Sequence, residues 1–439
     1  MDRRSFLKTS AGAPLAATAA YASSGATAEP AARADRPAGG FNETIQRARQ
    51  AALDVLKPSR RDLEHGLELH AASLVADCYG FSPRAALDVE AYRKVAESGA
   101  SAVELEDLRE EMSMTRSVTD PAQRAEYQEA WDAAGVTCIF QNAGEESQAP
   151  LRILKRLARF TYVTDMLRDF VVKAATPDDI VAAKKAGRHC LYFSSNGVPL
   201  AQIWENVESE MQYLRIFFQL GIRMMHITYN RRNMLGDGCG EANDGGLSDF
   251  GRACVAEMNR LGVIPDVAHS GWQTSLDTAK ASRRPMVASH SGCDAVHHHI
   301  RSKPDRVIRA ICDTGGYIGV CAIGGFLGGR GDLNAMLDHI QYVAKKFGAD
   351  HVAIGTDIAY SARTAPGESQ RMLKIWPSRR RWEYLWPAGA LGGTSHPSLA
   401  WTNWPMFTVG MVQRGLPDDD IQKILGGNML RVARASLSQ

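Results

Sequence analysis

The chain has 439 residues, of which 45% are hydrophobic and 23% are charged. This balance is typical of soluble globular proteins and excludes disordered, collagen-like and disulfide-scaffold proteins. With 51 Lys and Arg against 49 Asp and Glu, the net charge is only +2, which argues against a nucleic-acid binder. The length exceeds one average domain, but fits a single large barrel with insertions.

The first residues are typical of an export signal rather than of a folded element. The letters RRSFLK at 3–8 are followed by a weakly apolar stretch rich in alanine and by an A-x-A cleavage pattern at 26–28. This segment resembles a twin-arginine signal, so we expect residues 1–28 to be removed on export to the periplasm. Residues 29–42 are then expected to form a flexible linker. Neither the signal nor any later stretch reaches the ~20 apolar residues that a membrane span needs.

Residues 43–72 carry a helical pattern that is interrupted at 57–59. Short apolar runs then alternate with amphipathic helical stretches. Eight runs are found, at residues 74–77, 136–140, 190–193, 224–228, 263–267, 286–289, 317–321 and 351–355. Apolar runs separated by helices predict parallel strands buried on both faces, so we expect residues 43–439 to form a TIM (β/α)8 barrel.

An insertion at 360–404 follows the last predicted strand and carries five tryptophans together with the basic run 379–381. A long loop on this face serves as a lid over a ligand or as a subunit contact in a homodimer, and the sequence does not decide between them. The eight cysteines are scattered singly, mostly in apolar runs, and are expected to be buried free thiols.

Polar residues stand where the predicted strands end, which is where TIM barrels place their active sites. Two histidines, His269 and His290, and the carboxylate of Asp357 follow three different runs. Imidazoles hold a Lewis-acidic ion and a nearby carboxylate takes a proton from water. The residues themselves therefore indicate a metal-assisted hydrolase. We expect His226 to point away from this site, because it lies three residues before Tyr229 on the same predicted strand.

The order and spacing of several motifs resemble the membrane (renal) dipeptidase family of zinc peptidases, over roughly residues 62–434. The motifs are Gln219–Arg223, Ile227–Asn230, Gly246–Arg252, Met258–Gly262, Asp266–Ser270, Ala288–Ser291, Ile354–Asp357 and Leu425–Val432. The resemblance implies a metal-dependent-hydrolase-like barrel that cleaves dipeptides. It also implies that His269 and His290 are metal ligands, that Asp357 is the catalytic base and that Arg301 binds a substrate carboxylate.

The chain departs from the family at the other half of its two-zinc centre. If Asp77 is the aspartate that precedes the family's His-x-Asp motif, that motif falls on Tyr79-Gly80-Phe81, and the bridging glutamate falls on Ser195. A tyrosine, a phenylalanine and a serine cannot replace those ligands, so the resemblance implies that the first metal site is lost. Tyr229 and Asn196 are then expected to be polar contacts to the substrate.

One zinc ion on His269 and His290 is therefore expected, although the loss of all metal is an open alternative. A catalytic zinc normally has three protein ligands. The candidates for the third are Asp357, the possible extra ligand Asp77, and the loop residues Asp237, Cys239 and Glu241. We expect a hydrolase that acts on a dipeptide or a similar amide with a carboxylate. The alternatives are an enzyme of another class, such as a lyase or isomerase, and a non-catalytic periplasmic binder of small molecules.

Overall fold

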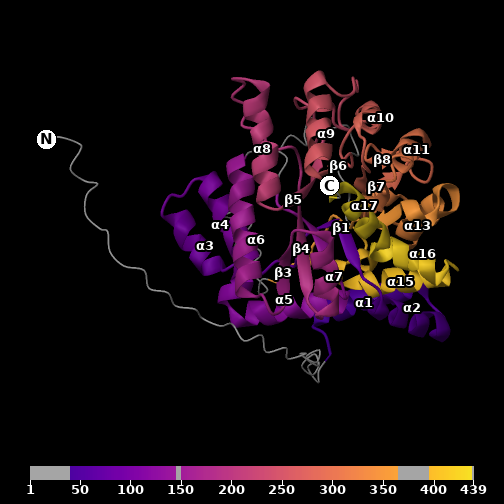
Figure 1. Ribbon diagram of the computed structural model, residues 1–439. Coiled ribbons are helices and arrows are strands. Elements are labelled where there is room, and N and C mark those ends of the chain that lie inside the picture. The colour runs from indigo at the N-terminus through magenta and orange to yellow at the C-terminus, as the bar shows by residue number, and fades with distance from the viewer. Residues whose placement is uncertain (1–39, 145–149, 364–394, 438–439) are drawn as a thin grey trace, which may run out of the picture. The chain divides into compact units, whose positions relative to one another are not determined.

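The computed structural model describes residues 40–144, 150–363 and 395–437 (Figure 1). In these residues, parallel strands form two curled arcs. One arc has the order β1-β2-β4-β5-β6, and the other has the order β10-β9-β7-β8. The strands are β1 (Ala76–Gly80), β2 (Cys138–Asn142), β3 (Val171–Ala174), β4 (His189–Ser195), β5 (Ile222–His226), β6 (Ile264–Asp266), β7 (Ala288–Cys293), β8 (Ser302–Lys303), β9 (Ile318–Val320) and β10 (Val352–Ile354).

Backbone and side-chain contacts join the two arcs into one α/β barrel. A parallel bridge pairs Asp266, at the end of β6, with Val287, just before β7. On the opposite edge, the Asp357 N–H donates to the carbonyl of Tyr79, and the Thr356 N–H donates to the Asp77 carboxylate. Each of the eight predicted apolar runs overlaps one strand of this barrel, so the predicted TIM-barrel class is confirmed.

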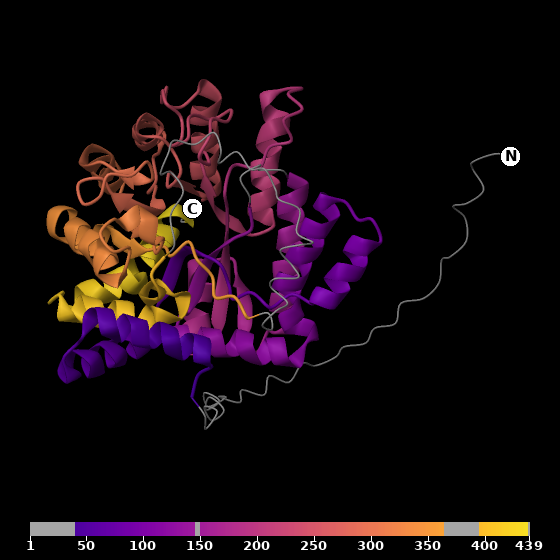
Figure 2. The same cartoon turned by 180° about the vertical axis from the view of Figure 1, so that it is seen from behind.

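Helices surround the strands on the outside (Figures 1 and 2). They are α1 (Glu43–Leu56), α2 (Arg60–Ala72), α3 (Val89–Glu97), α4 (Ala102–Thr119), α5 (Pro121–Ala134), α6 (Pro150–Met166), α7 (Pro177–Lys185), α8 (Val207–Gln219), α9 (Asp249–Leu261), α10 (Trp272–Ala281), α11 (Asp305–Asp313), α12 (Gly324–Leu327), α13 (Leu333–Phe347), α15 (Trp404–Gln413), α16 (Asp418–Gln422) and α17 (Asn428–Leu437). None of the described helices is long and apolar enough to cross a membrane.

The predicted break at 57–59 separates α1 from α2, because Ser59 caps α2 by accepting a hydrogen bond from the Asp62 N–H. Helix α2 packs directly on α15, near the other end of the described chain (Figures 1 and 2). The contact is close because Gly66 has no side chain. A Cβ there would lie 2.7 Å from the Cα of Val409. The N-terminal helices therefore belong to the body of the barrel.

The described part of the insertion does not form a surface over a ligand. Trp401 and Trp404 are fully buried, and the Trp401 ring packs edge-on against Trp131 at 5.3 Å. The sequence left open whether the insertion covers a ligand or forms a subunit contact, and these two residues instead pack in the core. The other three tryptophans, the basic run 379–381 and the predicted signal 1–28 lie outside the described residues, as does most of the linker. All eight cysteines are free, and seven of them are buried.

Candidate active site

Two imidazole rings meet at the end of the barrel strands. His269 follows β6, His290 lies in β7, and their Nε2 atoms are 2.9 Å apart. Both rings are buried. Burial, reinforced by the positive charge of Arg301, lowers the pKa of each imidazole well below its usual value. Both rings are therefore neutral at pH 7, which is the form that binds metal.

Hydrogen bonds on the far side of each ring fix which nitrogen carries the proton. The Nδ1 of His269 lies 2.6 Å from the side-chain oxygen of Asn230, which can only accept, so this Nδ1 is protonated. The Ser289 hydroxyl donates its one proton to the Asp266 carboxylate. It must therefore accept at its other contact, 2.8 Å from the His290 Nδ1, so that nitrogen is protonated too.

The two unprotonated Nε2 atoms are consequently 2.9 Å apart, and their lone pairs point towards each other. Two lone pairs at this distance repel each other unless both nitrogens bind the same cation. Histidine ligands of metals show this arrangement, with the second ring nitrogen donating to an oxygen that fixes the tautomer. The donor set of His269 and His290 therefore fits one metal ion.

Asp357 comes from the turn after β10 and faces the same pair. Its Oδ2 lies 3.9 Å from the His290 Nε2, and 16% of its side chain is exposed. The backbone of Asp357 has a φ of 57°, a conformation that costs energy for a residue with a side chain. Burial raises the pKa of its carboxyl group to about 6, while Arg301 acts in the opposite direction. A carboxylate with such a pKa is suited to accept a proton near neutral pH.

Arg301 and Tyr229 also adjoin the pair. The Arg301 guanidinium donates to the His290 carbonyl at 3.1 Å and lies over the Phe326 ring. Among the described residues, no carboxylate forms an ion pair with Arg301. The Tyr229 ring stacks on His269, with ring centres 4.1 Å apart. The structure thus brings the predicted metal, base and carboxylate-binding residues into one site.

The residues at the positions expected for the family's first metal ligands are engaged in other contacts. The Tyr79 ring stacks on His290 at 3.9 Å, and its hydroxyl donates to the side-chain oxygen of Asn196. Phe81 packs edge-on against Tyr79. The Ser195 hydroxyl donates to the Gly197 carbonyl at 2.6 Å instead of facing the histidines. A two-metal centre therefore does not fit these residues.

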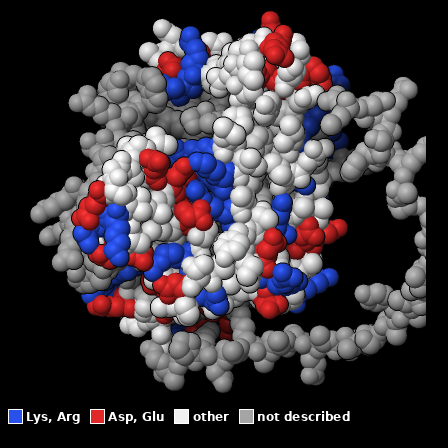
Figure 3. All heavy atoms as spheres, turned by 90° about the vertical axis from the view of Figure 1, so that its left-hand side faces the viewer, with Lys and Arg blue, Asp and Glu red and all other residues white. Residues whose placement is uncertain are grey.

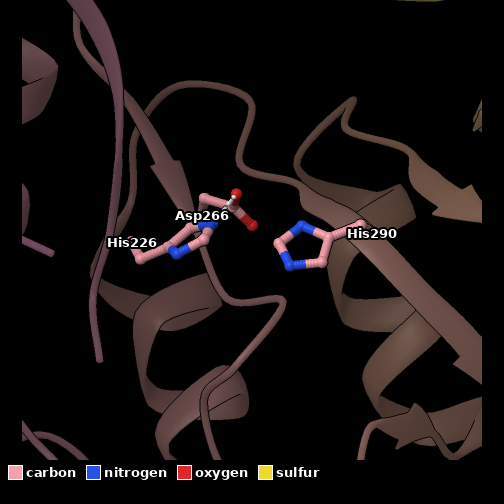
Figure 4. A group of neighbouring side chains, drawn as sticks. All are labelled: His226, Asp266 and His290. Carbon is pink, nitrogen blue, oxygen red and sulfur yellow. Dashed lines mark ion pairs between the residues drawn. The ribbon is translucent and has the colours of Figure 1, made fainter. Parts of the chain in front are cut away.

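Sequence reasoning placed His226 outside the site, and this expectation is wrong. Its Nε2 lies 2.7 Å from the Asp266 Oδ2, and its ring lies 5.3 Å from that of His290 (Figure 4). Strand β5 ends at His226, so the alternation of side chains does not extend to Tyr229. The signal that could have found His226 is its position at the carboxyl end of a barrel strand.

His226, Asp266 and His290 are the described residues that come close enough together to hold an ion as a group of three. The Asp266 carboxylate is already engaged, because it accepts from the Ala268 N–H, the Ser289 N–H and the Ser289 hydroxyl. We therefore assign this cluster the role of fixing the orientation of His290. The His226 Nδ1 is buried and has no hydrogen-bond partner among the described residues.

The other candidates for a third ligand are engaged in other contacts. Asp77 accepts from the Thr356 hydroxyl and, at 3.1 Å, from the Trp401 indole, so it ties β1 to the end of β10. In the loop after β5, Asp237 pairs with Arg232 and accepts from the Gly245 N–H at 2.6 Å. Of the other two loop candidates, Cys239 donates to Asn230 at 3.2 Å, and Glu241 accepts from the Arg232 N–H.

Comparison with known proteins identifies the family. The model of the membrane dipeptidases, peptidase family M19, matches residues 97–370. The chain belongs to this family. It is 24% identical to dipeptidase tcpJ of Claviceps purpurea over 277 residues, which are 62% of this chain and 57% of that protein. The chain thus spans little more than half the length of this curated relative.

Two solved structures from Pseudomonas aeruginosa share the fold. The probable dipeptidase PvdM superposes with a TM-score of 0.62 at 19% identity, over 86% of this chain and 99% of that one. An amidohydrolase superposes with a TM-score of 0.61 at 24% identity, over 85% of this chain and 99% of that one. At such identities the likeness shows the fold alone, so membership of a family of dipeptidase-type hydrolases rests on the family model.

Proposed function

We propose that this chain hydrolyses dipeptides or similar amides with one zinc ion held by His269 and His290. The observation that carries the proposal is the convergence of two unprotonated Nε2 atoms at 2.9 Å beside the Asp357 carboxylate. When bound, the ion supplies Lewis acidity and lowers the pKa of water. Membership of the dipeptidase family supports the same reaction.

The chain's own residues supply the remaining steps. Asp357 accepts a proton from the attacking water and passes it to the nitrogen of the cleaved amide, which leaves as an amine. Arg301 binds the substrate carboxylate, since its guanidinium has no carboxylate partner among the described residues. Tyr229 and Asn196 contact the polar groups of the substrate. Burial of the Tyr79 phenol raises its pKa well above the usual value, so this group stays protonated and keeps Asn196 oriented.

The test is a metal measurement combined with an activity measurement. We expect elemental analysis to find one zinc per chain in the purified wild-type protein and none in the His290→Ala variant. The wild-type protein should hydrolyse members of a dipeptide library, and Asp357→Asn should retain the metal but lose turnover. Two ions per chain would contradict the single-ion site. Absence of metal, with no turnover after zinc is added, would favour the non-catalytic binder or the other enzyme class.

We also propose export to the periplasm by the twin-arginine route. The support is the RRSFLK motif and the following A-x-A pattern, both in the sequence alone. Because this route carries folded proteins, the metal would be acquired before export. Replacing both Arg3 and Arg4 with lysine should leave the precursor in the cytoplasm, as measured by cell fractionation. Periplasmic delivery of the double variant at the wild-type level would overturn this proposal.

A further inference from the structure

A second guanidinium group lies close to the site and is not used by the proposed mechanism. Arg84 follows β1, and its backbone pairs with the segment after β10, with the Arg84 N–H donating to the Tyr360 carbonyl at 2.8 Å. Its guanidinium carbon lies 5.0 Å from the centre of the Phe81 ring. Among the described residues, its side chain has no hydrogen bond and no ion pair, although it is partly buried.

A series of ring contacts connects Arg84 with the histidines. Phe81, under the guanidinium, packs edge-on against Tyr79 with ring centres 6.0 Å apart. Tyr79 in turn stacks on His290 at 3.9 Å. The charge of Arg84 also acts on the Asp357 carboxylate, as that of Arg301 does. The two guanidinium groups therefore act on the same carboxylate from different segments, one after β1 and one after β7.

The surroundings of Arg84 do not neutralise it. Glu110 of α4 pairs instead with three arginines of α6, namely Arg152, Arg156 and Arg159. On the face of the molecule that Figure 3 shows, basic and acidic side chains gather together near the centre. A partly buried cation without a direct ion pair costs free energy, so such a group is a candidate for binding an anionic ligand.

We propose that the substrate carries two anionic groups, one bound by Arg301 and the other by Arg84. The substrate class is a dipeptide-like molecule with an acidic side chain or a second carboxylate. Arg84 is then a residue that determines specificity. This inference rests on the proposed function for the choice of dipeptides as ligands and for the role of Arg301. The aromatic support from Phe81 would hold the planar guanidinium ready for a bidentate contact with a carboxylate.

The test compares ligands that differ in charge but not in shape. Calorimetric titration of the Asp357→Asn protein loaded with zinc avoids turnover. The ligands are the pairs Ala-Glu with Ala-Gln and Asp-Ala with Asn-Ala, so that either position can carry the acid. We expect the acidic member of at least one pair to bind at least about tenfold more tightly than its neutral partner, which is the effect of one charge-assisted contact. In Arg84→Gln, added to the same background, this ratio should fall towards one.

Two further variants make the result specific. Arg301→Gln should weaken both members of each pair, because both share the terminal carboxylate. Arg252→Gln, on the exposed side of α9, should leave the ratio unchanged. Equal affinities within both pairs, no binding of any of the four dipeptides, or a ratio that survives Arg84→Gln would overturn the proposal.

Failure of this inference is distinguishable from failure of the proposed function. If the wild-type protein hydrolyses neutral and acidic dipeptides equally well, the hydrolase function holds and the role of Arg84 is wrong. If acidic dipeptides are preferred in binding but none is hydrolysed, the role of Arg84 holds and the hydrolase function is wrong.

Discussion

Replacing Asp357 with asparagine should abolish hydrolysis and also make the metal-free protein more stable at neutral pH. The carboxyl group has a pKa of about 6 in the fold against 3.8 in a model compound, because burial disfavours its charge. Folding must therefore oppose ionisation of this group. The penalty is absent below pH 3.8, grows as the pH rises, and is complete above about pH 6, where it reaches roughly 3 kcal/mol.

Asparagine removes the charge, keeps the shape and tolerates the backbone φ of 57° at this position. The assay is urea denaturation of metal-free wild type and Asp357→Asn at pH 4 and pH 8. We expect the variant to gain up to about 3 kcal/mol at pH 8 and almost nothing at pH 4. Loss of the base should lower the rate of hydrolysis at least about a hundredfold.

As a control, replacing the exposed Asp178 with asparagine should change neither the stability nor the rate of hydrolysis. Full turnover by Asp357→Asn would refute its role as a base. A variant that is less stable than the wild type at pH 8 would refute the claim that burial raises the pKa.

Three further substitutions test the supports of the site. Ser289→Ala should weaken zinc affinity about 10- to 100-fold, measured by competition with a chelator, because His290 loses the partner that fixes its tautomer. The control Ser291→Ala, on the same strand, should leave the zinc affinity unchanged. Asp77→Ala should lower the free energy of unfolding, measured by urea denaturation, by about 2–4 kcal/mol without changing the metal content. Loss of the ion in this variant would instead make Asp77 a ligand. Glu110→Gln should lower the free energy of unfolding by about 3–5 kcal/mol, because it leaves three arginines without their shared carboxylate. An unchanged urea midpoint would contradict this prediction.

The barrel was predictable because its strands are buried on both faces. Such strands appear in the sequence as continuous apolar runs, and each of the eight predicted runs overlaps a strand. Strand β3 was not predicted because it is short, includes Lys173 and lies beside only the first half of β4. The buried positions of Trp401 and Trp404 were not predictable either, since composition does not distinguish a tryptophan of the core from one of an interface.

The site was predictable where one residue per strand end was enough to identify it, as for His269, His290 and Asp357. Contacts between strands were not. The hydrogen bonds that join Asp266 to Ser289 connect neighbouring strands, 23 residues apart in sequence, and they depend on register. His226 was missed because side-chain alternation was extended beyond the last residue of β5. The roles of these residues stay predictions until metal and activity are measured.

In the proposed single-ion site, Tyr79 and Ser195, which stand at the positions expected for the family's first metal ligands, come from different strands than those that position His269 and His290. Tyr79 of β1 stacks on His290, and Tyr229 stacks on His269, so aromatic packing holds both imidazoles in place.

The guanidinium groups of Arg84 and Arg301 both act on the Asp357 carboxylate, but they are fixed to the protein and do not supply the Lewis acidity of a bound ion. They can attract and orient anions. The two proposals together predict a hydrolase that is selective towards acidic substrates, and the paired dipeptide titrations and the turnover measurement test these two properties separately.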